Sequence, residues 1–376
     1  MMRIGYDVTT LEGTMTGVGF YTARLLAHLL GREDGWRYEL LSNRPAAYLP
    51  IEPAVQSPRV RGPSGPFMPL RPLWLQAVMP IWLARSRLDV CHFTNSLLPL
   101  AAPGRLIVTI HDMSLFMFAQ YQRPRTQLVV RPLVRPSAQR AQAVITVSQS
   151  AKADIVRLLG IAPDRVHVIY EAAAPHFHPL ADTGHLDAVR ANYRLPAQFL
   201  LYVGTIEPRK NLVRVVEALA EVHQRGHPVP LILVGQWGPR AYCELMAAIE
   251  RLDMTPHVRF LGYVPTADLV ALYNLATMFV FPSEYEGFGL PVVEAMACGT
   301  PVVTADRSSL AEIVGDAGCR VDPYRVTEIA EAIVRLLGDA ELRAHLRLRG
   351  LARAAGFSWQ RAAEQTAALY AHVAAA

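Results

Sequence analysis

Two glutamates flank a glycine-containing loop in the last third of the sequence. Glu286 and Glu294 lie eight positions apart in "EYEGFGLPVVEAMACGTPVV", residues 284–303. The apolar run "MFVFPS" before them predicts a strand, and Pro291 suits the first turn of a helix, where no amide donor is needed. The loop "EGFGL" therefore lies at a helix N-terminus, where unpaired amides and the helix dipole favour an anion. We expect a phosphate group in this loop, with a carboxylate on each side to accept hydrogen bonds from sugar hydroxyls.

A second predicted strand-to-helix loop carries positive charge. In "YVGTIEPRKNL", Gly204 ends a strand, and Arg209 and Lys210 come directly before a helix. Cations are unfavourable at a helix N-terminus unless an anion balances them. The chain has 35 arginines and 2 lysines, so a lysine at position 210 indicates that a compact charge is needed. The first loop alone fits two unrelated surface glutamates equally well, but the two loops together favour a bound anion.

Two loops in the first half give weaker signals. "LEGTMTGVGFYT" places Gly13, Gly17 and Gly19 between the first predicted strand and its helix, and an ordinary turn fits this pattern as well as a phosphate loop does. "TIHDMSLF" places His111 and Asp112 at the carboxyl end of a strand. A lone His–Asp pair is more often structural than catalytic, although both residues face the predicted ligand edge.

The elements that position these loops alternate between β-branched runs and helical patterns, which is typical of parallel sheets covered on both faces. The predicted strands of the first half are "RIGYDV", "DVCHFT", "LIVTIHD", "AVITVS" and "VHVIYE". Those of the second half are "FLLYVG", "PLILVG", "VRFLGYV", "MFVFPS", "TPVVTAD" and "AGCRVD". The predicted fold class is α/β with two doubly wound domains, 1–182 and 196–357, joined by a polar linker, 183–195. Ligands of such sheets bind beyond the carboxyl ends of the strands.

The net charge of +5 is unevenly distributed. Residues 1–185 contain 19 basic and 12 acidic side chains, and residues 186–376 contain 18 basic and 20 acidic ones. Five arginines fall between Arg123 and Arg140, and the run 66–84 is apolar but interrupted by prolines. A solvated helix face with a packed loop explains this pattern, as does a surface for anionic lipid or an anionic acceptor. Basic residues interleaved with aromatic ones are missing, so we expect no nucleic-acid partner.

Other classes of protein are disfavoured by the sequence. The first residues are too soon interrupted by charge for a signal peptide, and no run reaches the roughly 18 apolar residues of a membrane span. We therefore expect a cytoplasmic protein, peripheral at most on the inner face of the cell membrane. Cys91, Cys243, Cys298 and Cys319 lie far apart and form no C-x-x-C pair, which favours structural thiols over disulfides or a zinc site.

The sequence resembles the retaining glycosyltransferases of the GT-B fold, family 4, in their mannosyltransferase-like branch. The likeness covers nearly the whole chain, in "TGVGFYT", "IHDMSLF", "AVITVSQSAKADI", "YVGTIEPRKNL", "FLGYVP", "FPSEYEGFGLPVVEAMACGTPVV" and "FSWQRAA". The paired glutamates with the Arg-Lys pair are the specific part of the match. The resemblance implies two Rossmann-like domains facing across a cleft, an acceptor domain followed by a nucleotide-sugar domain, with the final helix, 358–376, packed back on the first.

The resemblance also implies roles for single residues. Glu294 would bind the nucleotide ribose and Glu286 the transferred sugar, while Arg209 and Lys210 would stabilise the departing diphosphate. His111 would touch the donor sugar. The donor would also bind close to the backbone of six residues, which are Gly17, Gly19, Gly204, Phe288, Gly289 and Leu290.

The implied reaction moves a hexose from a nucleotide sugar, a GDP-hexose such as GDP-mannose above all, to a growing glycan, either a lipid-linked polysaccharide or O-antigen. No Asp-x-Asp motif is present, so no metal and no other cofactor are expected. The segment "IYEAAAP", residues 169–175, departs from relatives, which usually carry Asn-Gly there. Two alternatives are a nucleotide-sugar epimerase of the same fold and a catalytically silent scaffold that binds membrane or partner enzymes. Retention of Arg209, Lys210, Glu286 and Glu294 argues against the scaffold.

Overall fold

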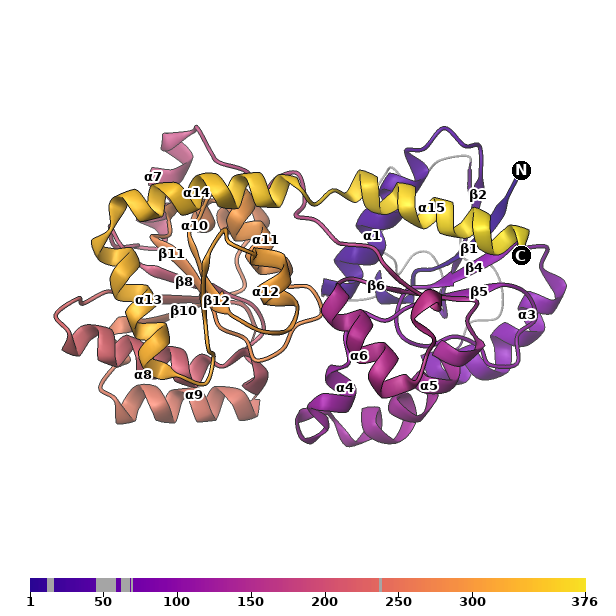
Figure 1. The fold of residues 1–376 in the computed structure, drawn as a ribbon, viewed down its shortest axis with the longest axis horizontal. Helices are drawn as coiled ribbons and strands as arrows, with labels where there is room; N and C mark the ends of the chain where they lie inside the picture. Colours follow the sequence, from indigo (N-terminus) through magenta and orange to yellow (C-terminus); the bar gives the residue numbers. More distant parts are fainter. Residues whose placement is uncertain (12–16, 45–58, 62–67, 69, 237–238) are drawn as a thin grey trace. The chain divides into compact units, whose positions relative to one another are not determined.

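The computed structural model describes residues 1–11, 17–44, 59–61, 68, 70–236 and 239–376. Gly13 of the glycine loop and residues 66, 67 and 69 of the proline-interrupted run lie outside the described residues. The chain forms two units, Met1–Glu171 with Ser358–Ala376, and Ala172–Phe357. Each unit contains one parallel sheet with helices on both faces (Figure 1).

The sheet of the first unit has seven strands in the order β3-β2-β1-β4-β5-β6-β7. Its strands are β1 Arg3–Asp7, β2 Arg37–Leu41, β3 Val60–Arg61, β4 Val90–Phe93, β5 Leu106–Thr109, β6 Ala143–Thr146 and β7 Val166–Val168. Every residue of β4, β5 and β6 is buried, as expected for strands covered on both faces. The strand order reverses between β1 and β4, which marks the ligand edge of this sheet.

The helices of the first unit lie on both faces of its sheet, with α1 and α15 on one face and α5 and α6 on the other (Figure 1). They are α1 Gly17–Leu30, α2 Arg71–Leu73, α3 Met79–Arg85, α4 Ser114–Met117, α5 Arg131–Arg140, α6 Gln149–Leu159 and, from the end of the chain, α15 Trp359–Ala375. Helix α15 packs along α1 and β4. A buried hydrogen bond of 2.6 Å between the hydroxyl of Tyr370 and Nδ1 of His92 joins it to the sheet.

The sheet of the second unit has six strands in the order β10-β9-β8-β11-β12-β13. Its strands are β8 Leu200–Val203, β9 Leu231–Val234, β10 Val258–Gly262, β11 Met278–Phe281, β12 Val302–Ala305 and β13 Cys319–Val321. Its helices are α7 Thr183–Asn192, α8 Leu212–Gln224, α9 Pro239–Arg251, α10 Thr266–Leu275, α11 Leu290–Ala297, α12 Ser308–Val314, α13 Val326–Gly338 and α14 Ala340–Ala355. Helices α8, α9 and α13 cover one face, and α10, α11 and α14 cover the other (Figure 1).

Glycines follow two of these helices. Gly160 and Gly299 come after α6 and α11 with φ angles of 68° and 77°, the left-handed conformation that glycine adopts without a steric penalty. Helix α8 buries one face, which includes Leu212, Val215 and Leu219.

Three elements differ from expectation. Strands β2 and β3 were not predicted, because β3 is a two-residue strand at the sheet edge and β2 carries a charge, Glu39, within its apolar pattern. The stretch 183–195, expected as a linker, contains helix α7, which packs on α10. The carboxylate of Asp182 accepts bonds from the amides of Gly184 and His185 and so caps this helix. The boundary between the units therefore lies at residue 171 or 172 rather than in 183–195.

Candidate active site

The two charged loops of the second unit meet because their strands are neighbours. β8 and β11 lie side by side where the strand order reverses, the point at which open parallel sheets bind ligands. The loop after β8 ends in a short 3-10 helix, Pro208–Lys210, and the loop after β11 carries Glu286. The backbone amide of Glu284 also donates to the carbonyl of Arg209, at 2.8 Å, which fixes one loop against the other.

The carboxylate of Glu286 is the centre of a buried polar cluster. Its Oε1 atom lies 2.5 Å from Nζ of Lys210 and 3.1 Å from Nη1 of Arg209, and it accepts a 2.7 Å bond from the hydroxyl of Ser283. Burial opposes ionisation, but the two cations and the hydroxyl overcome it and lower the pKa of Glu286 to about 2. In the described part of the chain no hydrogen-bond donor reaches Oε2, so this oxygen remains available as an acceptor for a ligand.

Lys210 is a nearly buried cation. Only 8% of the residue is exposed, and Nζ lies 4.9 Å from the ring centroid of Phe281. Burial and the neighbouring Arg209 lower its pKa, while Glu286 acts in the opposite direction. A buried ammonium needs an anionic partner, and here Glu286 supplies it.

Arg209 is anchored on two sides. Its Nη1 donates to the carbonyl of Tyr285 at 2.8 Å, and its Nε donates to Glu207 at 3.0 Å. The guanidinium is therefore held at the same edge of the sheet as Lys210, and an anion bound here would meet two positive charges.

The loop between Glu286 and α11 is braced by two serines of α12. The hydroxyls of Ser308 and Ser309 donate to the carbonyl of Glu286, at 2.7 Å and 2.9 Å. Gly289 has a φ of 102°, and a Cβ atom there would lie 2.6 Å from Leu310. The ring of Phe288 is buried, so only the backbone of this residue can face a ligand. At the start of α11, Pro291 has no amide hydrogen, and the amides of Val292 and Val293 donate to the carbonyl of Gly289 at 2.9 Å and 3.3 Å. Within this described helix start, the amide of Leu290 is therefore the donor left for a ligand.

Glu294 lies one turn into α11, and its Oε2 accepts a 3.1 Å bond from the hydroxyl of Tyr273 on α10. Burial raises the pKa of Glu294 to about 7, although the bond from Tyr273 acts against the increase. The two glutamates thus differ in charge state near neutral pH, since Glu286 is ionised and Glu294 is close to its midpoint.

Gly204 lies at the end of β8, with a φ of 149°. Its neighbour in the sheet is Gly235, at the end of β9, where a Cβ atom would lie 2.2 Å from the carbonyl oxygen of Gly204. Gly235 is therefore required by the close approach of the Gly204 backbone, and Gly204 is favoured by its positive φ angle. Sequence reasoning missed Gly235, although it ends "LILVG" as Gly204 ends "LLYVG".

The remaining predicted residues belong to the first unit. Gly17 and Gly19 lie in the first turn of α1 rather than in the loop before it, and Gly19 is buried. The imidazole of His111 follows β5, with Nε2 3.0 Å from the carbonyl of Thr94 and Nδ1 3.3 Å from Oε1 of Glu171. These two partners of His111 were not predicted, because they follow other strands.

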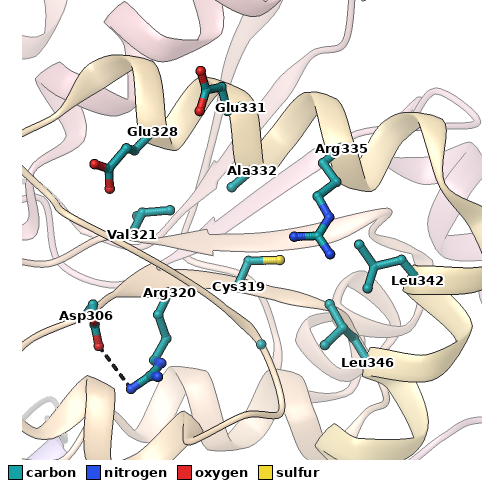
Figure 2. Close-up of a pocket in the computed structure, with 11 residues that line it drawn as sticks. Asp306, Cys319, Arg320, Val321, Glu328, Glu331, Ala332, Arg335, Leu342 and Leu346 are labelled. Atoms are coloured by element: carbon teal, nitrogen blue, oxygen red, sulfur yellow. Dashed lines mark ion pairs between the residues drawn. The ribbon is translucent and has the colours of Figure 1, made fainter.

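A separate cavity of about 530 Å³ lies at the β13 edge of the second unit (Figure 2). An ion pair of 3.0 Å joins Asp306 and Arg320 at one side of it. Its lining residues are Asp306, Gly318, Cys319, Arg320, Val321, Glu328, Glu331, Ala332, Arg335, Leu342 and Leu346. None of the predicted site residues lines this cavity, and its charges of both signs do not select an anion.

Comparisons with family models match both units of the chain. Residues 15–174 match the family model "Glycosyltransferase Family 4", and residues 190–352 match "Glycosyl transferases group 1". O-antigen chain mannosyltransferase B of Escherichia coli is 32% identical over 386 aligned positions, which cover 98% of this chain and 99% of that protein. The serotype-specific mannosyltransferase WbdA of Escherichia coli is 34% identical over 227 positions, 59% of this chain and 28% of that protein.

Solved structures share the fold at lower identity. Sucrose-phosphate synthase of Thermosynechococcus elongatus has a TM-score of 0.77 at 24% identity and covers 100% of both chains. HepE of Anabaena, solved with UDP and glucose, has a TM-score of 0.78 at 20% identity, over 99% of this chain and 100% of that one.

Two doubly wound units, with a cationic loop facing a glutamate loop at the switch point of the second, define a glycosyltransferase of the GT-B fold. The chain belongs to glycosyltransferase family 4. The expected fold, family and class of enzyme are thus confirmed. Across the described residues, no helix is both long enough and apolar enough to cross a membrane.

Proposed function

We propose that this enzyme transfers a hexose, mannose from GDP-mannose or another GDP-hexose, with retention of configuration, to a growing cell-surface polysaccharide such as lipopolysaccharide O-antigen. The observation that carries the proposal is the cluster of Arg209, Lys210 and Glu286 before the start of α11. Glu294 lies about one turn into the same helix. The choice of mannose and of O-antigen is supported by the name of the Escherichia coli relative that matches the chain end to end.

In the proposed complex the donor diphosphate lies against the amide of Leu290, at the start of α11, and against the side chains of Arg209 and Lys210. Negative charge grows on the diphosphate as the bond to the sugar breaks, so these cations act mainly on the transition state. Oε2 of Glu286 accepts a hydrogen bond from a hydroxyl of the transferred sugar, and Glu294 accepts hydrogen bonds from the two ribose hydroxyls.

The proposed reaction needs no general base from the protein. The bond between the anomeric carbon and the diphosphate oxygen breaks, and the acceptor oxygen bonds to the same carbon on the same face. The proton of the acceptor hydroxyl passes to the leaving phosphate. Arg209 and Lys210 supply the positive charge at the diphosphate, so the proposal includes no divalent metal and no other cofactor.

The proposed acceptor is a glycan, and a lipid-linked glycan would be reached at the inner face of the cell membrane. A surface of the first unit suits such contact. Met117, Tyr121, Leu128 and Val129 are 40%, 44%, 77% and 40% exposed, and residues 113–140 contain five arginines and no acidic residue. We call residues 114–135 the basic apolar surface. Within this surface, the side chain of Gln127 donates hydrogen bonds to the carbonyls of Leu115 and Ala119. These bonds hold the segment around Gln127 against the segment 115–119.

Thermal stabilisation of the purified enzyme by a panel of nucleotide sugars tests the choice of donor. We expect GDP-mannose to raise Tm more than UDP-glucose, UDP-N-acetylglucosamine or GDP alone, because binding to the folded state stabilises it by mass action. Acceptor-free incubation of the same samples separates the transferase from an epimerase, which would isomerise donor without acceptor. A larger shift with a UDP-sugar would contradict the proposed base.

A further inference from the structure

Glu171 is a buried carboxylate to which the proposed reaction gives no role. It follows β7 in the segment "IYEAAAP", and 4% of the residue is exposed. A buried carboxylate is costly unless it is paired. It pairs with His111, whose Nδ1 lies 3.3 Å from Oε1 of Glu171.

Both ring nitrogens of His111 face acceptors. Nε2 lies 3.0 Å from the carbonyl oxygen of Thr94, and a carbonyl only accepts, so Nε2 carries a hydrogen. Nδ1 faces a carboxylate oxygen. A ring that donates to both partners carries a hydrogen on each nitrogen and has a positive charge.

Two uncharged rings, those of Tyr21 and His92, lie around that of His111. The ring of Tyr21, on α1, meets that of His111 edge-on, with centroids 4.6 Å apart, and its hydroxyl lies 3.1 Å from Oγ1 of Thr109. His92, on β4, is neutral, because burial and the charge of His111 lower its pKa to about 3. The adjacent carboxylate of Asp112 accepts a 2.8 Å bond from the amide of Ser114.

We propose that Glu171 is a positioning residue that fixes the imidazole of His111 and holds a hydrogen on Nδ1. His111 then presents a fixed positive charge at the carboxyl end of β5, with both N–H groups used inside the first unit. This inference rests on the proposed function and on the role that the family resemblance gives His111, which is contact with the donor sugar. A fixed charge there favours the departing diphosphate. It also revises the expected role of His111, since neither ring nitrogen remains free to bond a sugar hydroxyl.

The test is ¹⁵N NMR of the full chain with labelled histidine near pH 7, with His111→Gln used to assign the signal. We expect Nδ1 of His111 to be protonated in the wild type and to lose that hydrogen in both Glu171→Gln and Glu171→Asn. Asp164→Asn, which removes an exposed carboxylate just before β7, should leave the signal unchanged. An unprotonated Nδ1 in the wild type, or one unaltered in both Glu171 variants, would overturn the proposal.

Kinetics give a second readout. Misplacing a group at a reacting centre costs roughly 10- to 100-fold in rate, so Glu171→Gln should lower kcat by about that factor with little change in KM. Unchanged kcat would contradict the positioning role. The NMR result does not depend on the identity of the donor, so a failed assignment of the donor leaves this test intact.

Discussion

Nζ of Lys210 and Oε1 of Glu286 lie 2.5 Å apart, although the residues are separated by 76 positions in the sequence. The carboxylate of Glu286 is thereby paired with Lys210, the cation that we propose binds the donor diphosphate. Until a ligand arrives, this internal anion compensates the buried charge of Lys210. A bound diphosphate has to compete with the carboxylate of Glu286 for Lys210. A complete nucleotide sugar also offers Glu286 a sugar hydroxyl, from which the carboxylate accepts a hydrogen bond.

The competition predicts opposite effects of Glu286→Gln on product and on turnover. Loss of the carboxylate removes both the rival anion and the repulsion of the diphosphate, so GDP should bind about tenfold more tightly, a gain of about 1.4 kcal/mol. Turnover should fall by about 100-fold, because the transferred sugar loses a charged acceptor. Calorimetry with GDP measures the first effect and a transfer assay the second.

Glu284→Gln is the matched control for this prediction. Glu284 lies in the same loop but pairs with Arg214 at 3.1 Å, outside the cluster. It should change neither quantity by more than about twofold, because the partly buried pair that it breaks lies outside the cluster. Weaker binding of GDP to Glu286→Gln would show that the carboxylate supports the cations and does not compete with the phosphate.

Lys210→Ala should depress kcat more than it raises KM. The contact strengthens as the phosphate leaves and so acts mainly on the transition state, with an expected loss of about 100-fold or more in kcat. The other lysine of the chain, Lys152 on α6, provides the control, and Lys152→Ala should retain full activity. Because removal of a buried cation can destabilise the fold, Lys210→Met, which keeps the apolar stem, should show the same kinetic pattern. Raised KM with unchanged kcat in both Lys210 variants would refute the assignment.

Donor binding should depend on pH through Glu294. Its pKa is raised to about 7, and the ionised carboxylate is the better acceptor for two ribose hydroxyls. Affinity should therefore fall about tenfold from about pH 8 to about pH 6, as the carboxylate becomes protonated. Glu294→Gln should bind more weakly and lose this dependence. If the affinity of Glu294→Gln for the donor changed with pH as much as that of the wild type, the titrating group would be a residue other than Glu294.

The same shift has a consequence for the stability of the ligand-free enzyme. The pKa of Glu294 in the folded state lies above its ordinary value of 4.5. The contribution of protonated Glu294 to the free energy of unfolding is therefore complete below about pH 4.5. It is lost as the pH rises through about 7. Relative to Glu294→Gln, the wild type should thus become less stable over this interval, as measured by denaturant unfolding at each pH. A constant difference would mean that Glu294 titrates normally in the folded state.

The basic apolar surface, residues 114–135, should bind anionic membranes. Attraction is worth about 1 kcal/mol per basic residue near the surface and decays within about 8 Å at physiological salt. Sedimentation should recover the enzyme with anionic liposomes at low salt and release it at high salt. Leu128→Ser with Arg125→Gln should reduce recovery without changing transfer to a soluble acceptor. Equal recovery on neutral vesicles, or none on either, would favour a soluble acceptor.

The sequence predicted the strands and loops that carry the site but not how their side chains meet. Arg209 and Lys210 were identified because cations are unfavourable at a helix start, and Glu286 and Glu294 because they flank a glycine-containing loop. The pairing of Lys210 with Glu286 depends on β8 lying beside β11, and strand order cannot be deduced from local patterns.

The same limit explains the residues that were missed. Tyr273 and Ser309 reach the site from α10 and α12, through contacts that leave no periodic signal in the sequence. Glu171 was noticed only as a departure from relatives, and its partner His111 follows a strand two places away in the sheet.

The most direct test of the central claim is transfer by the purified enzyme from GDP-mannose to a lipid-linked O-antigen acceptor in excess chelator, with the anomeric configuration of the product determined by NMR. The account predicts turnover without metal, an α-linkage that retains the configuration of the donor, and loss of both product and GDP release in Lys210→Ala. An inverted product, turnover that returns only when magnesium is added, or full activity of Lys210→Ala would contradict it.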